Sequence, residues 1–153
     1  MHAGCDWTGV ALDKFASSEI IALVVDDDDT TRELVIRLLT AMGAAEVIAA
    51  SDGGEGLRLV FERHPHLVIC DVSMQPVDGL ALLGGVRASV DYSIANTPII
   101  LFTATQESLL LRKARGLGVS GYMVKPFNPK GFASYVCEVL EKKAFPAQGK
   151  AGR

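Results

Sequence analysis

The stretch IIALVVDDDDTTREL, residues 20–34, joins an apolar run to four consecutive aspartates and then to a polar segment. The apolar run has the length and the isoleucine and valine content of a buried β-strand. Four adjacent carboxylates repel one another, so they call for solvent, a helix N-terminus, a cation or a chemical role. The stretch therefore predicts a buried strand and leaves four roles open for the carboxylates that follow it.

The length and composition of the chain are those of one globular domain. It has 153 residues, of which 49% are hydrophobic, and a formal net charge of −3. So mild an acidity gives no electrostatic reason to expect nucleic-acid binding. The three cysteines, Cys5, Cys70 and Cys137, have neither CxxC nor metal-site spacing, which is typical of reduced thiols in the cytosol. We therefore expect a cytoplasmic protein with no signal peptide, no membrane contact and no nucleic-acid partner.

After residue 20 the chain alternates short apolar runs with amphipathic stretches. Five runs have strand length: Ile20–Val25, Glu46–Ala50, Leu67–Cys70, Pro98–Thr103 and Gly121–Val124. The stretches between them carry apolar residues at helical spacing, and Gly43 and Asn128 are typical helix stop and start signals. This alternation predicts an α/β fold, a doubly wound parallel sheet with helices on both faces. The two most uniformly apolar runs, Ile20–Val25 and Leu67–Cys70, should be central.

The two ends of the chain lie outside this alternation. We expect three parts: an N-terminal extension at residues 1–18, the domain at residues 19–143 and a disordered tail at residues 144–153. Trp7, Val10, Ala11 and Phe15 could form one apolar face of a short helix. Such a helix could dock on the domain or form a frayed extension, and we favour a weakly packed helix.

Chemically active side chains follow four of the predicted strands. Asp26–Asp29 come after the first strand, Asp71 after the third, Thr103 ends the fourth, and Lys125 follows the fifth. In open parallel sheets, ligands bind beyond the carboxyl ends of the strands. Clustered carboxylates suit Mg²⁺ or Mn²⁺, and an aspartate such as Asp71 can attack phosphorus to form an acyl phosphate. The arrangement therefore predicts metal-assisted phosphoryl chemistry at this edge of the sheet.

Four pieces of the chain together resemble one known family. They are VVDDDD, VICDVSMQPVDGL, PIILFTA and GYMVKPF, and they cover roughly residues 19–143 in family order. In these pieces the chain resembles the receiver domain of two-component response regulators, in the single-domain CheY-like form. The resemblance implies a flavodoxin-like strand order of 2-1-3-4-5. It also marks residues 88–97 as long for the family, which predicts an enlarged loop before the fourth strand.

The resemblance implies a phosphorylation site and a metal site. Asp71 matches the phosphorylated aspartate. Asp26 and Asp27 match the acidic pair that binds Mg²⁺ (or Mn²⁺), with Asp71 and the backbone carbonyl of Ser73 completing the ligands. One position departs from the family pattern: proline usually stands four residues after the phosphorylated aspartate, where this chain has Gln75.

The resemblance also implies a switch and its partners. Thr103 matches the hydroxyl that moves toward the phosphoryl group, and Tyr122 matches the aromatic residue coupled to it. Lys125 matches the lysine that pairs with the phosphoryl group and precedes a cis proline, here Pro126. The phosphoryl donor would be a histidine kinase or a histidine phosphotransfer protein. The chain would then be a stand-alone phosphoacceptor switch and not an enzyme.

The output of such a switch would be a protein–protein contact or onward phosphotransfer. The implied contact surface is the face formed by the helix near residues 109–115, the strand at 121–124 and the helix that begins near residue 129.

The remaining two aspartates of the opening stretch receive structural roles. Asp29 falls where a helix should begin, so it is predicted to be the N-cap residue. Asp28 is predicted to face solvent at the rim of the site.

Two other functions remain as alternatives. Asp26, Asp28 and Thr30 fit the DxDxT signature of haloacid-dehalogenase-type phosphatases, in which Asp26 would be the nucleophile. That reading leaves Asp71 without a role, and the acids after Lys125 fall on a predicted helix. The other alternative is a receiver-like protein that is never phosphorylated and acts by binding alone.

Overall fold

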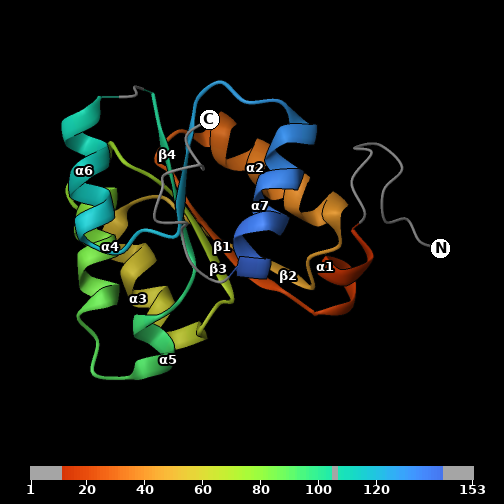
Figure 1. The fold of residues 1–153 in the computed structure, drawn as a ribbon, viewed down its shortest axis with the longest axis horizontal. Coiled ribbons are helices and arrows are strands. Elements are labelled where there is room, and N and C mark those ends of the chain that lie inside the picture. The colour runs from red at the N-terminus through yellow and green to blue at the C-terminus, as the bar shows by residue number, and fades with distance from the viewer. Residues whose placement is uncertain (1–11, 105–106, 143–153) are drawn as a thin grey trace.

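The computed structural model describes residues 12–104 and 107–142 of the chain. Within these residues it contains five β-strands and seven helices, arranged as a sheet between two layers of helices (Figure 1). The predictions made for Trp7, Val10, Ala11 and the tail at 144–153 lie outside the described residues.

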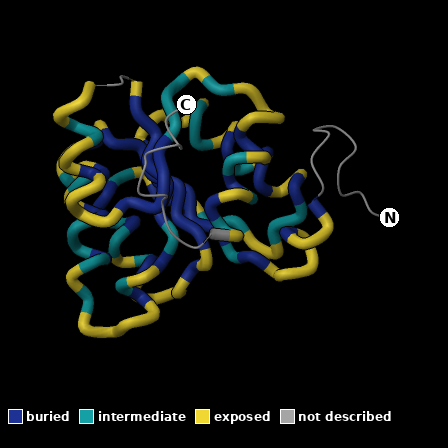
Figure 2. The backbone as a smooth tube through the Cα atoms, in the orientation of Figure 1, coloured by how far each residue is buried: buried dark blue, intermediate teal, exposed yellow. Residues whose placement is uncertain are grey.

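The five strands form one parallel sheet in the order β2-β1-β3-β4-β5, as predicted. They are β1 (Ile21–Val25), β2 (Glu46–Ala50), β3 (Leu67–Asp71), β4 (Ile99–Thr103) and β5 (Gly121–Val124). β1 and β3 lie inside the sheet, which confirms the position predicted from their apolar runs. Every residue of β3 and β4 is buried, as expected for strands covered on both faces (Figure 2).

Helices cover both faces of the sheet. One face carries α1 (Asp13–Ser17), α2 (Asp29–Met42) and α7 (Pro129–Lys142). The other face carries α3 (Gly53–Arg63), α4 (Gly79–Arg87), α5 (Tyr92–Ala95) and α6 (Ser108–Gly116) (Figure 1). No helix in the described part of the chain is long and apolar enough to cross a membrane.

Alternate residues along each strand send their side chains to opposite faces, which gives two buried clusters. The α2–α7 cluster lies beneath those helices and includes Leu39, Phe102 and Phe132. The α3–α4 cluster lies on the other face and includes Leu82 and Leu101. Leu101 and Phe102 are neighbours on β4 but belong to different clusters. A shift of one residue would exchange their faces, so burial on both sides fixes the register of this strand.

The N-terminal helix α1 packs against the α2–α7 cluster. Leu12 and Phe15 are only 1% and 5% exposed. Gly43, which ends α2 in a left-handed conformation with φ of 106°, lies directly against Ala16. A Cβ on Gly43 would approach the Cβ of Ala16 to 2.7 Å. The prediction of weak packing is therefore wrong for the described part of this helix, because its apolar side chains find partners in the core.

The segment before β4 contains a helical turn that the sequence analysis did not foresee. The sequence predicts an enlarged loop at residues 88–97, and α5 lies within it. Asp91 caps this helix by accepting the N–H groups of Ser93 at 3.0 Å and Ile94 at 3.4 Å. Ile94 is buried in the α3–α4 cluster. A helix of four residues is too short to show a periodic apolar pattern, so in the sequence only its N-cap residue indicates it.

Arg87 joins three segments at the edge of the sheet where β4 and β5 begin. Its guanidinium donates hydrogen bonds to the carbonyl oxygens of Ala95 at 2.9 Å, Thr97 at 2.7 Å and Gly118 at 2.8 Å. It also donates to Ser120 Oγ at 3.3 Å. Because a guanidinium reaches several acceptors in fixed directions at once, arginine is suited to this position in a way that lysine is not.

We predict that Phe15→Ala lowers the free energy of unfolding by about 3–5 kcal/mol, because it removes a buried ring from the α2–α7 cluster. Lys14→Ala changes an exposed neighbour in the same helix and should alter stability by less than about 0.5 kcal/mol. Urea unfolding followed by circular dichroism measures both. Equal effects of the two substitutions would show that α1 does not pack on the core.

We predict that Arg87→Lys lowers the free energy of unfolding by about 2 kcal/mol, because three carbonyl acceptors, two of them in part-buried hydrogen bonds, lose their donor together. Arg58→Lys is the matched control, since Arg58 pairs with Glu62 at 2.9 Å on the exposed face of α3. It should cost less than about 0.5 kcal/mol. The same unfolding measurement separates the two variants. If Arg87→Lys lowers the free energy of unfolding by less than Arg58→Lys does, the hydrogen bonds of Arg87 do not stabilise this edge of the sheet.

Candidate functional site

The C-terminal edge of the sheet gathers the polar side chains that follow the strands. Asp26 directly follows β1, Asp71 ends β3, Thr103 ends β4 and Lys125 directly follows β5. Carboxylate oxygens of Asp26, Asp27 and Asp71 all lie within 4.8 Å of one another. The structure thus brings together the carboxylates that the sequence separates by more than forty residues.

Lys125 is the cation of this acidic cluster. Its Nζ donates a hydrogen bond to Asp71 Oδ1 at 3.0 Å and lies 3.5 Å from Asp26 Oδ2. The Asp26 side chain is 3% exposed and that of Asp71 10%, so both ion pairs are largely shielded from water. The ammonium group therefore links the ends of β1, β3 and β5.

The surroundings shift the pKa of both Asp71 and Lys125. Burial raises the pKa of Asp71; the hydrogen bond from Lys125 counteracts part of that rise, and the charge of Asp26 adds to it. Burial alone would lower the pKa of Lys125, but the hydrogen bond to Asp71 and the charge of Asp26 outweigh it and raise the pKa. Lys125 is therefore a cation at neutral pH. A second cation close to Asp71 would stabilise its ionised form further.

Asp26 is held in place by the turn that follows it. Its Oδ1 accepts the N–H of Asp28 at 2.9 Å, and its backbone carbonyl accepts a hydrogen bond from Arg32 at 2.7 Å. Arg32 also pairs with Asp29 Oδ1 at 2.6 Å. The role of Arg32 was not predicted from the sequence. The signal was present, because an acid three residues before an arginine is a common helical ion pair.

The structure corrects the role predicted for Asp29. Asp28 is the N-cap of α2, since its carboxylate accepts the N–H of Thr31 at 2.9 Å and the Thr31 hydroxyl at 2.6 Å. Asp29 is the first helical residue. Its negative charge interacts favourably with the positive end of the helix dipole and pairs with Arg32. The prediction is wrong by one residue because aspartate suits both positions, and hydrogen-bond geometry alone distinguishes them.

The loop at residues 72–78, between β3 and α4, is anchored at both ends by backbone hydrogen bonds. Gly79 N–H donates to the Val72 carbonyl at 2.9 Å, and Gly53 N–H donates to the Val77 carbonyl at 3.2 Å. A Cβ on either glycine would overlap a carbonyl oxygen of the facing backbone. Close approach of the α3 and α4 N-termini to this loop therefore requires glycine at both positions.

A hollow opens to solvent beside Asp27. It is lined by Asp27, the loop residues Ser73 and Gln75, and Leu110 of α6, among others. The Gln75–Pro76 peptide bond in this loop is cis. Ser73 is exposed at the same side of the site as Asp27. The hollow gives small molecules or a partner side chain access to the acidic cluster.

Thr103 and Tyr122, the two predicted switch residues, are both buried, at 3% and 6% exposure. The Thr103 carbonyl accepts the N–H of Lys125 at 2.8 Å. The Tyr122 ring belongs to the α3–α4 cluster. The Lys125–Pro126 peptide bond is cis, as the resemblance implied. The two predicted switch residues thus lie on neighbouring strands, and the backbone of Thr103 contacts that of the lysine.

The residues of the acidic cluster fit a divalent cation. Three carboxylates and one ammonium leave two negative charges to be neutralised. Mg²⁺ binds oxygens at about 2.0–2.1 Å, so two of its ligands lie at most about 4.2 Å apart. Carboxylate oxygens within 4.8 Å of one another reach such positions with small side-chain movements. The open hollow beside Asp27 also leaves room for the water ligands that Mg²⁺ retains.

Comparison with known sequences identifies a family. The family model for the response regulator receiver domain matches residues 22–136. A probable chemotaxis protein CheY from Rhizobium etli is 34% identical over 111 residues, which are 72% of this chain and 84% of that protein. A probable transcriptional regulator ycf27 from Porphyra purpurea is 36% identical over 120 residues. Those residues are 78% of this chain but only 47% of that relative, so the chain spans about half of its length.

Solved structures share the fold. Chemotaxis protein CheY4 of Vibrio cholerae matches with a TM-score of 0.73 and 29% identity, over 78% of this chain and 98% of that one. A putative response regulator from Chloroflexus aurantiacus matches with a TM-score of 0.73 and 31% identity, over 80% and 98% of the two chains. With a family match over residues 22–136 and this strand order, the chain belongs to the response regulator receiver domains, the phosphoacceptor domains of two-component signalling.

Proposed function

We propose that Asp71 accepts a phosphoryl group from a histidine kinase or a histidine phosphotransfer protein, in a reaction that depends on Mg²⁺ or Mn²⁺. The observation that carries this proposal is the setting of Asp71. It is a buried carboxylate with Lys125 Nζ at 3.0 Å and the carboxylates of Asp26 and Asp27 close enough to share a cation. An aspartate that merely ended a strand would need none of these neighbours.

The transfer exchanges one bond to phosphorus for another. A carboxylate oxygen of Asp71 attacks the phosphorus, and the bond from phosphorus to the imidazole nitrogen of the donor breaks. The second ring nitrogen of the donor already carries a proton, so the imidazole leaves as a neutral group. Lys125 already contacts Asp71 and would pair with a phosphoryl oxygen of the product. The Thr103 hydroxyl would donate a hydrogen bond to another oxygen. These two residues would stabilise the negative charge of the acyl phosphate.

The metal ligands would be Asp26, Asp27, Asp71 and the carbonyl of Ser73. A bound Mg²⁺ supplies positive charge that neutralises phosphoryl oxygens. The protein would orient these ligands. Asp26, the most buried of them, is held by hydrogen bonds from the Asp28 N–H and from Lys125. The hollow beside Asp27 supports entry of the phosphoryl donor from that side.

The output surface in this proposal is the face formed by α6, β5 and α7. Thr103 and Tyr122 lie on β4 and β5, so a hydroxyl that moves toward the phosphoryl group frees space into which the Tyr122 ring can turn. Ala114 is the one fully buried residue of α6, so this helix can shift without exposing much core. The phosphorylated state would be read by a protein that contacts this face, or the phosphoryl group would be passed on in a relay.

We expect acetyl phosphate and Mg²⁺ to add one phosphoryl group to the wild type and none to Asp71→Asn, because the nucleophilic oxygen is lost. Asp26→Asn should still be labelled, but about 10–100-fold more slowly, since a ligand of the cation is weakened. Intact-mass spectrometry over time measures all three proteins.

Two outcomes would contradict this assignment. Labelling carried by Asp26 in the Asp71→Asn protein would favour the phosphatase-type reading of the DxDxT stretch. A wild type that gains no phosphoryl group would favour a receiver-like protein that acts by binding alone.

We predict that Mg²⁺ raises the thermal unfolding midpoint of the wild type and of Asp29→Asn, and does not raise that of Asp27→Asn. Both substitutions remove one exposed carboxylate from the same stretch, but Asp27 alone belongs to the acidic cluster. A ligand that binds the folded state selectively stabilises it. Differential scanning fluorimetry with EDTA or with excess Mg²⁺ measures the shift of the midpoint for each protein. Equal shifts in the two variants would show that Asp27 is not a metal ligand.

A further inference from the structure

Tyr135 of α7 makes a polar contact with β5 that the proposed phosphorylation chemistry does not use. Among the described strands β5 lies at an edge, so alternate N–H groups on its outer side have no strand to pair with. The N–H of Tyr122 donates instead to the Tyr135 hydroxyl at 3.0 Å. A side chain of α7 thus takes the place of a neighbouring strand.

Gly121 makes this contact possible. A Cβ at position 121 would overlap the Tyr135 hydroxyl oxygen and lie 2.9 Å from the ring carbon that bears it. The φ angle of Gly121 lies outside the left-handed region, so its backbone conformation does not require glycine. The close approach of Tyr135 does require it.

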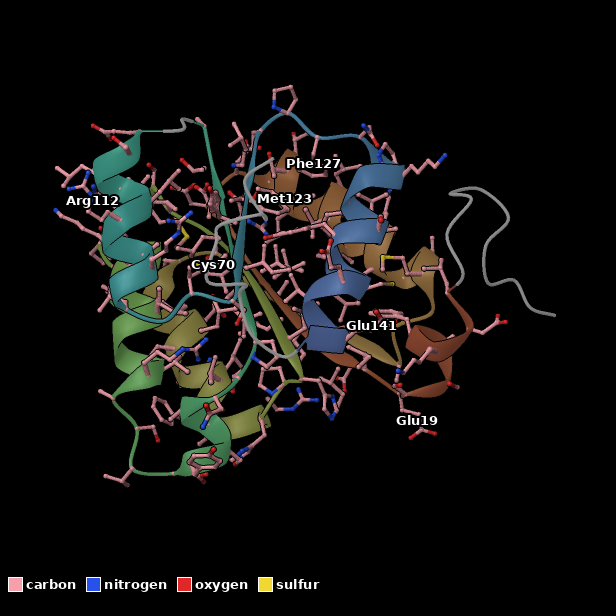
Figure 3. The ribbon with its side chains drawn as sticks, in the orientation of Figure 1. Glu19, Cys70, Arg112, Met123, Phe127 and Glu141 are labelled. Carbon is pink, nitrogen blue, oxygen red and sulfur yellow. The ribbon has the colours of Figure 1, made fainter. Side chains whose placement is uncertain are left out.

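Tyr122 is tied to helices on both faces of the sheet. Its ring is buried in the α3–α4 cluster, which also contains Ala114 of α6. Its N–H donates to the hydroxyl of Tyr135, whose side chain packs against the α2–α7 cluster. The side chain of the next strand residue, Met123, packs against the same cluster (Figure 3). A displacement of Tyr122 therefore acts on α6 through its ring and on α7 through Tyr135.

The Tyr135 hydroxyl keeps the same protonation state in this contact over the physiological pH range. Burial raises its pKa well above the usual value for tyrosine, and the nearby Glu138 adds to the rise. The hydroxyl therefore stays protonated and neutral through the physiological pH range. The contact can respond to movement of β5 without titrating.

We propose that Tyr135 is a positioning residue that couples α7 to the state of Tyr122. Its hydroxyl fixes β5 against α7, so that phosphorylation-dependent movement of Tyr122 displaces α7 together with α6. The inference rests on the proposed function, because it needs Asp71 as phosphoacceptor and Tyr122 as the residue that responds. It specifies how the signal crosses from one face of the sheet to the other.

Tyr135→Phe tests the coupling, because it removes the acceptor oxygen and keeps the ring. Tyr92→Phe is the matched control, since Tyr92 is 82% exposed on α5. Amide hydrogen exchange is followed by NMR with Mg²⁺ alone and with Mg²⁺ plus beryllium fluoride, a mimic of the phosphoryl group. In Tyr135→Phe the Tyr122 amide should exchange about tenfold faster, as expected for loss of one hydrogen bond. The control should match the wild type.

The response of α7 decides the inference. In the wild type and in Tyr92→Phe, beryllium fluoride should change exchange in both α6 and α7. In Tyr135→Phe it should still change exchange in α6 and leave α7 as it was. An unchanged Tyr122 amide, an α7 that does not respond in the wild type, or a full α7 response in Tyr135→Phe would overturn the inference. A wild type that acetyl phosphate fails to label would instead overturn the proposed function.

Discussion

Lys125 lies between two buried carboxylates, Asp71 and Asp26, and these ion pairs constrain the whole C-terminal edge of the sheet. Buried like charges are costly unless a cation offsets them, so the positions of all three groups must be fixed. Strand order fixes them. β1 pairs with β3 so that Val25 faces Cys70, and the residues that follow these two in the chain, Asp26 and Asp71, are therefore side by side. A different order of strands would separate these aspartates, so the site is a consequence of the topology.

Close approaches at three glycines shape the rim of the site and the edge strand beside it. Gly53 and Gly79 stand where a Cβ would overlap a carbonyl oxygen, and their N–H groups hold the two ends of the loop after β3. Gly121 plays the same part at β5, where the obstacle is the Tyr135 hydroxyl. Each of these glycines lets two elements approach by the width of a side chain. The loop is therefore held by hydrogen bonds between backbone groups even though its sequence departs from the family at Gln75. The edge strand is held by a hydrogen bond from its backbone to the Tyr135 hydroxyl.

Most of the fold could be predicted from the sequence because apolar runs separate strands from helices over the whole domain. The gathering of Asp26 and Asp71 could also be predicted, since parallel strands end at one edge. Features decided by a single hydrogen bond or by a short contact could not. The assignment of the cap to Asp29 in place of Asp28 is one example. Another is α5, whose four residues show no period. Tyr135 is a third, because nothing in a helical pattern reveals that a ring reaches the outer edge of a strand.

α6 and α7 lie on opposite faces of the sheet and differ in how they are anchored, and this difference limits how a signal can travel. In α6, Ala114 is the one fully buried residue, so local changes in packing are enough to move it. α7 buries Phe132, Val136 and Val139 in the α2–α7 cluster, so loosening it would expose a large apolar surface. A helix packed in this way moves as a unit or not at all. To displace it, the strand needs a directional link, and the hydrogen bond from the Tyr122 N–H to the Tyr135 hydroxyl is a link of that kind.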